Sequence, residues 1–302
     1  MKSIDIVVAT EQSYINPPAS HWRAIQVVQE DNAVVEAFQK LGFHAIRKGW
    51  DDPDFCWDES KCVLIRTTWN YSENFDKFQS WLNQVNKSCH LFNSLPIIQW
   101  NINKNYLHDM EQKGVNVVPT VYASSCISLK EVMKARNWPE IVIKPVVSAG
   151  ALDTYLISYH DVEKYQPLFE KLVMEKEMMV QPLQKNILQS GEKSCIVFEN
   201  RFSHAIRKIP KLGDFRVQEV YGGKVEAYMP NEEEKKFAEK AIACAPYPVQ
   251  YARVDFTQDQ DNNPVLMELE LIEPELFFRF DTQAAMRLAR TIQNCLVKNS
   301  KI

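Results

Sequence analysis

The sequence has 302 residues, of which 45% are hydrophobic and 25% charged, and a formal net charge of −4 at pH 7 with a pI near 5.9. This composition is typical of a globular chain of two or three domains, and its acidic balance gives no electrostatic footprint for nucleic acid. No apolar run reaches the roughly 18 residues that a membrane span requires, and the N-terminal run is too short for a signal peptide.

The seven cysteines are scattered, and none lies in a CxxC pair. An odd number of dispersed cysteines in a chain of this size indicates free thiols, neither a disulfide framework nor a zinc site. We therefore expect a cytoplasmic protein without a nucleic-acid or membrane partner. The sequence leaves the oligomeric state open, and a homodimer is possible.

The first hundred residues alternate between strand-like and helix-like segments, which predicts an open, mostly parallel α/β sheet. The predicted strands are Ile4–Ala9, Phe43–Ile46 and Cys62–Ile65, and the predicted helices are Trp22–Leu41 and Phe75–Val85.

Arg66 directly follows the third of these strands, in the segment RTTWNY. Open α/β sheets bind ligands at the carboxyl ends of their strands, so Arg66 could clamp a substrate carboxylate. An arginine packed among the aromatic residues of this segment is an equally good interpretation.

The rest of the chain divides into two further ranges. The sequence of residues 99–184 predicts both helices and strands. From Gly191 the pattern changes to that of antiparallel strands. The predicted helices are 103–113, 128–136, 162–174, 231–245 and 284–297, and the predicted strands are 115–122, 141–157 around a loop, 178–183, 194–199, 201–208, 216–220 and 224–228. We place soft domain boundaries near residues 98 and 185.

A hairpin is predicted within residues 251–278. Two apolar runs, Ala252–Phe256 and Pro264–Leu269, flank a polar turn. Glu268 and Glu270 are two residues apart on one strand and so share a face, which Asp255 can reach from the paired strand. Three carboxylates on a rigid hairpin suit Mg²⁺, and a solvated polar strand face is the alternative.

Arg253 lies two residues before Asp255 and is expected on the same face. It could balance the charge of the carboxylates, or steady a phosphoryl group as charge develops on it. Glu273 could meet a substrate amine or cap the following helix.

Lys144 ends the β-branched strand IVIK, where an ammonium suits a phosphate. The loop Val147–Ala151 follows, and Ser148, Ala149 and Gly150 are small enough for main-chain N–H groups to approach phosphate oxygens. A tight hairpin turn is the favoured alternative for this loop, and the P-loop motif is absent.

Several other residues are candidates for the site only in combination with their neighbours. Lys104, in NINKNYL, is predicted on a helix with an ordinary polar face. Residues 179–183 (MVQPL) could form a hinge whose main chain meets an adenine edge, with Glu192 accepting from ribose hydroxyls. Three further cations are predicted on neighbouring strands: Arg207, Lys208 and Arg216. Surface ion pairs are the more usual role of such residues in an acidic chain.

Taken in order, these pieces resemble the ATP-grasp superfamily. ARVDF at Ala252–Phe256 is similar to the corresponding strand of D-alanine–D-alanine ligases, and SGEKSCIVFENRFSHAIRKIP resembles the bacterial glutathione synthetase layout. The segments RTTWNY, LFNS, NINKNYL, FSHAIRK and LMELELIEPELF are similar to the glutathione synthetase-like branch that includes an O-ureido-D-serine cyclo-ligase.

The resemblance implies an ATP-grasp fold of mixed α/β class, α+β in its C-terminal part. It implies a Rossmann-like N-terminal pre-ATP-grasp domain at residues 1–98, an ATP-grasp N-lobe at 99–184 and a C-lobe at 185–302. The residues implied to bind ATP are Lys104, Lys144, Ser148, Ala149, Gly150, Gln181, Pro182, Leu183 and Glu192. Asp255, Glu268 and Glu270 would bind one or two Mg²⁺ ions, or Mn²⁺. Arg253 and Arg216 would stabilise the transferring phosphoryl group.

The implied activity is that of an ATP- and Mg²⁺-dependent ligase. Family chemistry activates a carboxylate or carbonyl oxygen as an acyl phosphate, which an amine attacks to form a C–N bond, with release of ADP and phosphate. The implied substrate is a small, amino-acid-like molecule. The alternatives are an ATP-grasp ligase that modifies a peptide or protein tail, and a nucleotide-binding interaction protein without catalysis. The sequence departs from the family pattern at Glu270, where Asn is common, and in its glycine-poor loop.

Overall fold

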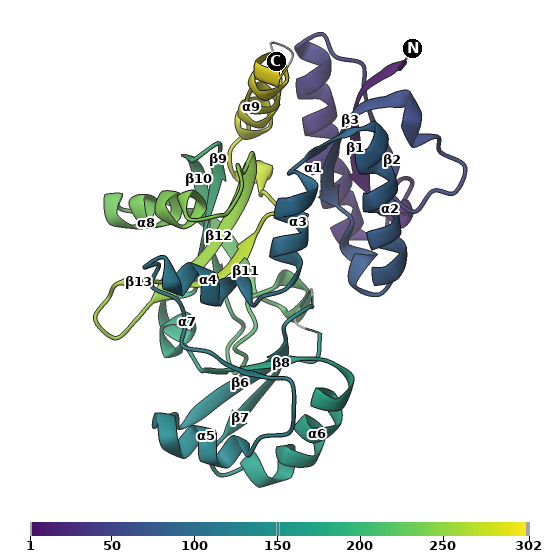
Figure 1. Cartoon of the computed structure of the whole chain (residues 1–302). Coiled ribbons are helices and arrows are strands. Elements are labelled where there is room, and N and C mark those ends of the chain that lie inside the picture. Colours follow the sequence, from purple (N-terminus) through teal and green to yellow (C-terminus); the bar gives the residue numbers. More distant parts are fainter. Residues whose placement is uncertain (1, 149, 151, 300–302) are drawn as a thin grey trace.

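The computed structural model describes residues 2–148, 150 and 152–299, and three β-sheets with flanking helices fill most of this range. Figure 1 shows the N-terminal sheet at the upper right, a second sheet in the middle and a third sheet at the bottom. The mixed α/β class predicted from sequence is confirmed. Each sheet lies inside one of the predicted ranges 1–98, 99–184 and 185–302, and the division into three domains stays a prediction.

The N-terminal sheet is parallel, as its alternating pattern predicted. Its strands follow the order β2-β1-β3-β4. The strands are β1 (Ile4–Thr10), β2 (Ala45–Gly49), β3 (Ser60–Thr67) and β4 (His90–Phe92), and the helices are α1 (Trp22–Lys40) and α2 (Phe75–Ser88). Strand β2 begins two residues later than predicted, and β4 was missed because three residues are too few to show a period.

Two short helices lead from this sheet into the rest of the chain: α3 (Leu95–Ile102) and α4 (Tyr106–Gln112). The prediction of a helix from residue 103 was therefore wrong at its start. Lys104 lies in the turn between the two helices, and its main-chain N–H donates to the main-chain oxygen of Val146 at 2.9 Å.

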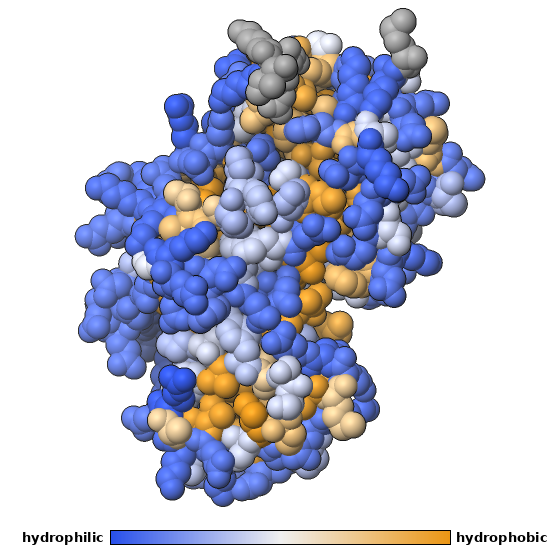
Figure 2. Space-filling model, in the orientation of Figure 1, coloured by the Kyte–Doolittle hydropathy of each residue, from blue (hydrophilic) through white to orange (hydrophobic). Residues whose placement is uncertain are grey.

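The lower sheet in Figure 1 is antiparallel and has a core of its own. The order β5-β8-β6-β7 joins β5 (Val121–Ala123), β6 (Glu140–Pro145), β7 (Tyr155–Ser158) and β8 (Met178–Pro182), with α5 (Leu129–Arg136) and α6 (Val162–Glu175). Ser128 caps α5 as predicted, because its Oγ accepts from the main-chain N–H of Glu131. Figure 2 shows hydrophobic residues gathered on this lobe within a largely hydrophilic face.

The middle sheet is also antiparallel, in the order β11-β10-β9-β12-β13. Its strands are β9 (Glu192–Phe198), β10 (Arg201–Ile209), β11 (Lys224–Tyr228), β12 (Tyr251–Gln258) and β13 (Pro264–Glu270), and its helices are α7 (Lys185–Ser190), α8 (Glu232–Ala243) and α9 (Ala284–Asn299). The predicted hairpin is present as β12 and β13. The short 3-10 helices of the chain are η1 (Gln12–Tyr14), η2 (Trp57–Glu59), η3 (Trp69–Ser72), η4 (Glu219–Tyr221) and η5 (Phe278–Phe280).

The strand predicted at residues 216–220 is absent, and this prediction was wrong. The connection between β10 and β11 is a loop that contains η4. Gly213 and Gly222 adopt positive φ angles at its two ends, and Arg216 is tied back to Asp214 by main-chain and side-chain hydrogen bonds. Because of these local turns, residues 216–220 do not pair with a neighbouring strand, although their sequence alternates as a strand would.

Side chains buried at one junction connect the N-terminal sheet to the middle sheet. Asn93, just after β4, donates through Nδ2 to the main-chain oxygens of Tyr251 (2.9 Å) and Leu271 (2.7 Å). Its Oδ1 accepts from the main-chain N–H of Gln250 at 2.7 Å. The buried Tyr251 hydroxyl lies 2.7 Å from the main-chain oxygen of Ile65 in β3. The two sheets are therefore joined by hydrogen bonds as well as by a shared hydrophobic core.

All seven cysteines are free, as expected from their spacing. Among the described residues, no helix combines the length and the hydropathy needed to cross a membrane.

Replacing Asn93 tests the junction. Asn93→Ala leaves two buried carbonyl oxygens and one N–H group without a partner, so we expect the free energy of unfolding to fall by about 2 kcal/mol or more, measured by urea denaturation. Asn83→Ala, at an exposed position on α2, is the matched control and should change stability by no more than about 0.5 kcal/mol. Equal losses in the two variants would contradict this account of the junction.

Candidate active site

A cavity of about 540 Å³ lies where the three sheets approach one another, and residues from all three parts of the chain line it. Every described residue that the family resemblance implied at the site is part of this lining. They are Lys104, Lys144, Ser148, Gly150, Gln181, Pro182, Leu183, Glu192, Arg216, Arg253, Asp255, Glu268 and Glu270. Ala149, the remaining predicted residue, lies outside the described residues.

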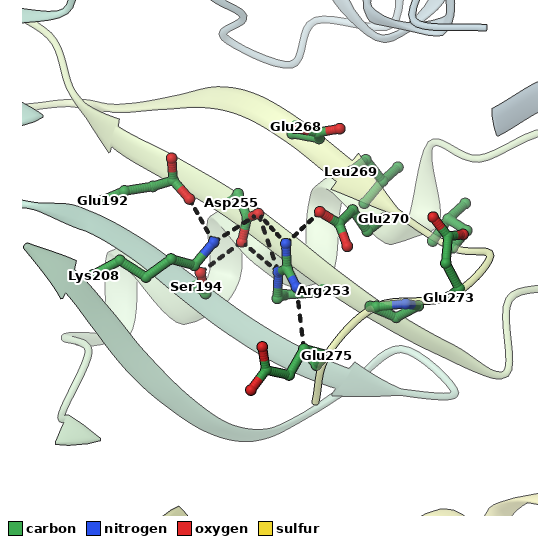
Figure 3. Close-up of polar contacts among 12 residues, drawn as sticks. Glu192, Ser194, Lys208, Arg253, Asp255, Glu268, Leu269, Glu270, Glu273 and Glu275 are labelled. Atoms are coloured by element: carbon green, nitrogen blue, oxygen red, sulfur yellow. Dashed lines mark hydrogen bonds and ion pairs between the residues drawn. The ribbon is translucent and has the colours of Figure 1, made fainter. Parts of the chain in front are cut away.

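The hairpin places its charged residues on one face, as its period predicted. In the antiparallel register, Asp255 is opposite Glu268, and Arg253 is opposite Glu270. Directly opposite residues of an antiparallel pair point to the same side of the sheet. Figure 3 shows the four side chains with their neighbours from β9 and β10.

Asp255 is the most heavily hydrogen-bonded carboxylate of the site. It accepts from Arg253 Nε and Nη2 at 2.9 Å each, from Ser194 Oγ at 2.6 Å and from Lys208 Nζ at 3.1 Å. Lys208 also donates to Glu192 at 2.6 Å. Burial acts to raise the pKa of Asp255, but Arg253 and Lys208 outweigh it and hold the pKa well below its usual range. Asp255 is therefore a fixed negative charge.

Glu268 faces two lysines. Lys104 Nζ lies 3.2 Å from Glu268 Oε1 and donates to the main-chain oxygen of Ser148 at 2.8 Å. Burial acts to raise the pKa of Glu268, but Lys104 and Lys144 lower it further than burial raises it. Burial lowers the pKa of Lys144; Glu268 opposes this effect and Lys104 adds to it. Two cations thus lie close together, an arrangement that favours a polyanionic ligand.

The acidic residues at the end of β13 are less well neutralised. Glu270 pairs with Arg253, yet burial and then the neighbouring Glu268 charge raise the pKa of Glu270 to about 7. Burial, with a further contribution from Glu270, raises the pKa of Glu273 to about 8. This end of the cavity therefore holds more carboxylates than cations.

The small-residue loop contacts the loop between β10 and β11. The Tyr221 hydroxyl donates to the main-chain oxygen of Gly150 at 3.2 Å. The Arg216 guanidinium lies 3.8 Å from the centre of the Tyr221 ring and forms an ion pair with Asp214 at 2.8 Å. Gly150 has a φ of 63°, which favours glycine, while a Cβ there would meet open space. Backbone conformation, not crowding, explains this glycine.

The predicted hinge lies at the end of β8 and the turn after it. Gln181 donates through Nε2 to Thr120 Oγ1 at 2.9 Å, and the main-chain N–H of Leu183 donates to the main-chain oxygen of Glu140 at 3.0 Å. These bonds fix the position of the hinge against β5 and β6. The contact of this hinge with an adenine stays a prediction.

Arg66 does not line the cavity, and the proposal that it clamps a substrate carboxylate was wrong. Its side chain is fully buried and donates to Glu30 Oε1 at 2.7 Å and to the main-chain oxygen of Pro274 at 2.9 Å. The guanidinium carbon lies 5.7 Å from the centre of the Phe278 ring. The packed interpretation is the one that the structure supports.

Two cavity residues were missed as site residues. Lys208 was noted only as added positive charge, although its register opposite Glu192 and its distance from Asp255 place it inside the cavity. Alternation along the strand FSHAIRK could have found it. Arg23 also lines the cavity, from the first turn of α1, and no local pattern marks that position.

Among residues 2–148, 150 and 152–299, no group of three or more His, Cys, Asp or Glu side chains is arranged to hold a metal ion. The predicted ligands are instead paired with cations: Asp255 and Glu270 with Arg253, and Glu268 with Lys104. Their chemistry nevertheless fits Mg²⁺, because they are hard oxygen donors on one sheet face. Their role as ligands stays a prediction.

Comparison with known proteins identifies the family. Residues 110–292, more than half of the chain, match the model of the RimK-like ATP-grasp domain. The chain belongs to the RimK-like ATP-grasp family. Residues 6–93 match the model of the N-terminal domain of D-cycloserine synthetase DcsG.

Individual relatives agree with this family. The chain is 25% identical over 282 residues to the cycloserine biosynthesis protein DcsG of Streptomyces lavendulae, which covers 86% of this chain and 91% of that protein. The crystal structure of D-cycloserine synthetase DcsG has a TM-score of 0.84 at 22% identity, covering 96% of this chain and 99% of that one. D-Alanine–D-alanine ligase from Bacillus anthracis has a TM-score of 0.69 at 13% identity, covering 99% of each chain.

These findings confirm the ATP-grasp fold and the family resemblance noted in the sequence. The protein is an ATP-dependent ligase of the carbon–nitrogen class, as predicted. The family uses ATP with a divalent metal ion and binds ATP together with a substrate.

The raised pKa of Glu273 predicts a pH dependence. The folded protein holds a proton on this group up to about pH 8, whereas its ordinary pKa is 4.5, so the stability it contributes is complete below pH 4.5 and lost as pH rises through 8. We expect the free energy of unfolding of the wild type to fall more steeply between about pH 5 and pH 8 than that of Glu273→Gln.

The control for this experiment is Glu36→Gln, at an exposed position on α1, which should keep the slope of the wild type. Equal slopes for the wild type and Glu273→Gln would show that Glu273 does not retain its proton. Urea denaturation at each pH measures the free energies.

Proposed function

We propose that the protein is an ATP- and Mg²⁺-dependent ligase that joins an amine to a carboxylate or carbonyl carbon of a small, amino-acid-like substrate. Bound ATP and its metal ion supply the phosphoryl group that activates the acceptor oxygen and the charge that steadies it. The amine then forms the C–N bond, and phosphate leaves. This chain contributes mainly position and charge, since phosphoryl transfer needs little covalent help from side chains.

The residue roles follow from the charges of the cavity. Lys104 and Lys144 would bind phosphate oxygens, because Lys104 is buried, Lys144 is partly buried, and Lys104 acts on Lys144 as a neighbouring positive charge. The main chain around Ser148 and Gly150 would cover the phosphates. Residues 181–183 and Glu192 would hold the nucleoside, and Arg253 with Arg216 would stabilise the transferring group.

Asp255, Glu268 and Glu270 would hold one or two Mg²⁺ ions, and Mn²⁺ would suit the same oxygens. Because Glu268 and Glu270 are paired with Lys104 and Arg253, metal binding would require these carboxylates to exchange a side-chain cation for the ion. Glu270 in place of a neutral amide adds one negative charge to the set, which favours a divalent cation.

One observation carries the proposal: the residues predicted from their order along the chain converge on a single cavity. Three domains, 1–98, 99–184 and 185–302, would each contribute one wall. The similarity to DcsG, whose name describes a cycloserine biosynthesis protein, supports a small amino-acid-like substrate over a peptide tail. The net charge of −4 supports the same choice.

Removing Lys144 tests nucleotide binding. Lys144→Met should weaken binding of ADP by about tenfold or more in calorimetry, because it removes a charged partner of the phosphates. Lys171→Met, at an exposed position on α6, is the matched control and should bind like the wild type. Unchanged affinity in Lys144→Met would show that this lysine does not contact the nucleotide.

ADP release tests the reaction. We expect release with Mg²⁺ and ATP to depend on one member of a panel of amino acids, dipeptides and O-ureidoserine, and to fall about a hundredfold or more in Glu268→Gln. Glu36→Gln is the control. Silence with the whole panel while the nucleotide still binds would instead support a binding protein without catalysis, and release that needs only dipeptides would support the peptide alternative.

A further inference from the structure

The end of the cavity opposite the predicted hinge is built largely by the N-terminal part of the chain. Arg23, Trp69 and Tyr71 line it, together with Glu273 and Glu275 from the segment after β13. In Figure 1, α1 lies in the upper part of the molecule and the sheet that carries the hinge lies in the lower part. A nucleotide held at the hinge therefore leaves this end for the second substrate.

Arg23 presents a guanidinium group with few partners. Its carbon lies 4.9 Å from the centre of the Trp69 ring, and Nη2 lies 3.9 Å from Glu275 Oε2, which is too far for a hydrogen bond. Within the described part of the chain, no hydrogen bond to this guanidinium is formed. Its planar fork of donors matches the two oxygens of a carboxylate.

Glu273 presents an acidic group. Its main-chain oxygen accepts from Trp69 Nε1 at 2.9 Å, which fixes the backbone at this position. Its carboxylate forms no ion pair with any described lysine, arginine or histidine, and Figure 3 draws it without a contact to its labelled neighbours. Burial beside Glu270 disfavours the ionised form of Glu273, and the positive charge of a ligand would favour it.

Glu275 differs from Glu273, because it already has a partner. Arg279 forms an ion pair with Glu275 and reaches Glu219 at 2.8 Å, and Arg279 does not line the cavity. At this end, Arg23 thus offers a guanidinium without a hydrogen bond and Glu273 a carboxyl group without an ion pair to a described residue. Trp69 lies between them, with its ring against the first and its indole N–H bonded to the second.

We propose that Arg23 and Glu273 form a subsite for a free, zwitterionic amino acid, with the substrate carboxylate at Arg23 and its amino group at Glu273. The inference rests on the proposed function and makes its substrate class specific. A residue inside a peptide has neither charge free, so the same subsite disfavours a peptide chain and selects a single amino acid or its side-chain derivative.

Binding to the full-length protein tests the subsite without relying on turnover. Calorimetry in the presence of Mg²⁺ and a non-hydrolysable ATP analogue compares alanine, serine and O-ureidoserine of both hands with ethanolamine, which lacks the carboxylate, and glycerate, which lacks the amine. We expect at least one amino acid to bind about tenfold or more tightly than either analogue.

Each variant should remove the contribution of one protein side chain to the binding of the amino acid. Arg23→Gln should weaken amino-acid binding by about tenfold while leaving ethanolamine almost unchanged, and Glu273→Gln should weaken amino-acid and ethanolamine binding while sparing glycerate. Arg23→Lys keeps the charge without the fork and serves if Arg23→Gln does not fold. The matched control is Arg279→Gln, which removes an arginine beside Glu275 from outside the cavity.

Three results would overturn the inference: no amino acid in the panel binds, the single-charge analogues bind as tightly as the amino acids, or Arg23→Gln weakens every probe equally. Binding of the ATP analogue is measured on the same samples. If the nucleotide binds and ADP is released while the preference for zwitterions is absent, the subsite is wrong and the proposed ligase stands. If the wild type does not bind the nucleotide either, both the subsite and the proposed ligase function are wrong.

Discussion

The geometry of the cavity depends on buried side chains of the N-terminal part that hold the main chain after β13. Glu30 accepts from the main-chain N–H groups of Leu276 at 2.7 Å and Phe278 at 3.2 Å, and Arg66 bonds to both Glu30 and Pro274. Burial raises the pKa of Glu30 to about 7, and the charge of Arg66 opposes that rise. Buried ion pairs contribute little net stability, but removing one partner is costly, so the pair acts mainly to specify position.

Charge is distributed unevenly inside the cavity, and this distribution separates its two ends. Lys104 and Lys144 lie toward the loop after β6, whereas Glu270 and Glu273 lie at the end of β13. Between them, Arg253 binds both Asp255 and Glu270. A chain with an acidic net charge thus keeps two lysines at one end of the cavity and several carboxyl groups at the other, which agrees with the phosphate and amine sites proposed above.

Sequence patterns predicted what depends on neighbours a few residues away. The period of two in β12 and β13 was sufficient to place Asp255, Glu268 and Glu270 on one face. The side chain of Arg66 is held by a main-chain oxygen 208 residues later in the chain. No local pattern therefore distinguishes a buried arginine from one that lines the cavity, such as Arg23. The turn that holds Lys104 and the loop around Arg216 were mistaken for regular elements, because local hydrogen bonds there override the periodicity.

The contacts that hold the segment after β13 have a consequence for how this enzyme can evolve. Glu30, Arg66 and Asn93 form hydrogen bonds with main-chain atoms of residues 271–278 and with none of their side chains. A main-chain hydrogen bond is indifferent to the identity of the residue that offers it. The side chains at positions 273 and 275 can therefore be exchanged by mutation while the segment keeps its course. Under the proposed role of Glu273, a change of acceptor would need substitutions in this short segment and no rebuilding of the scaffold that carries it.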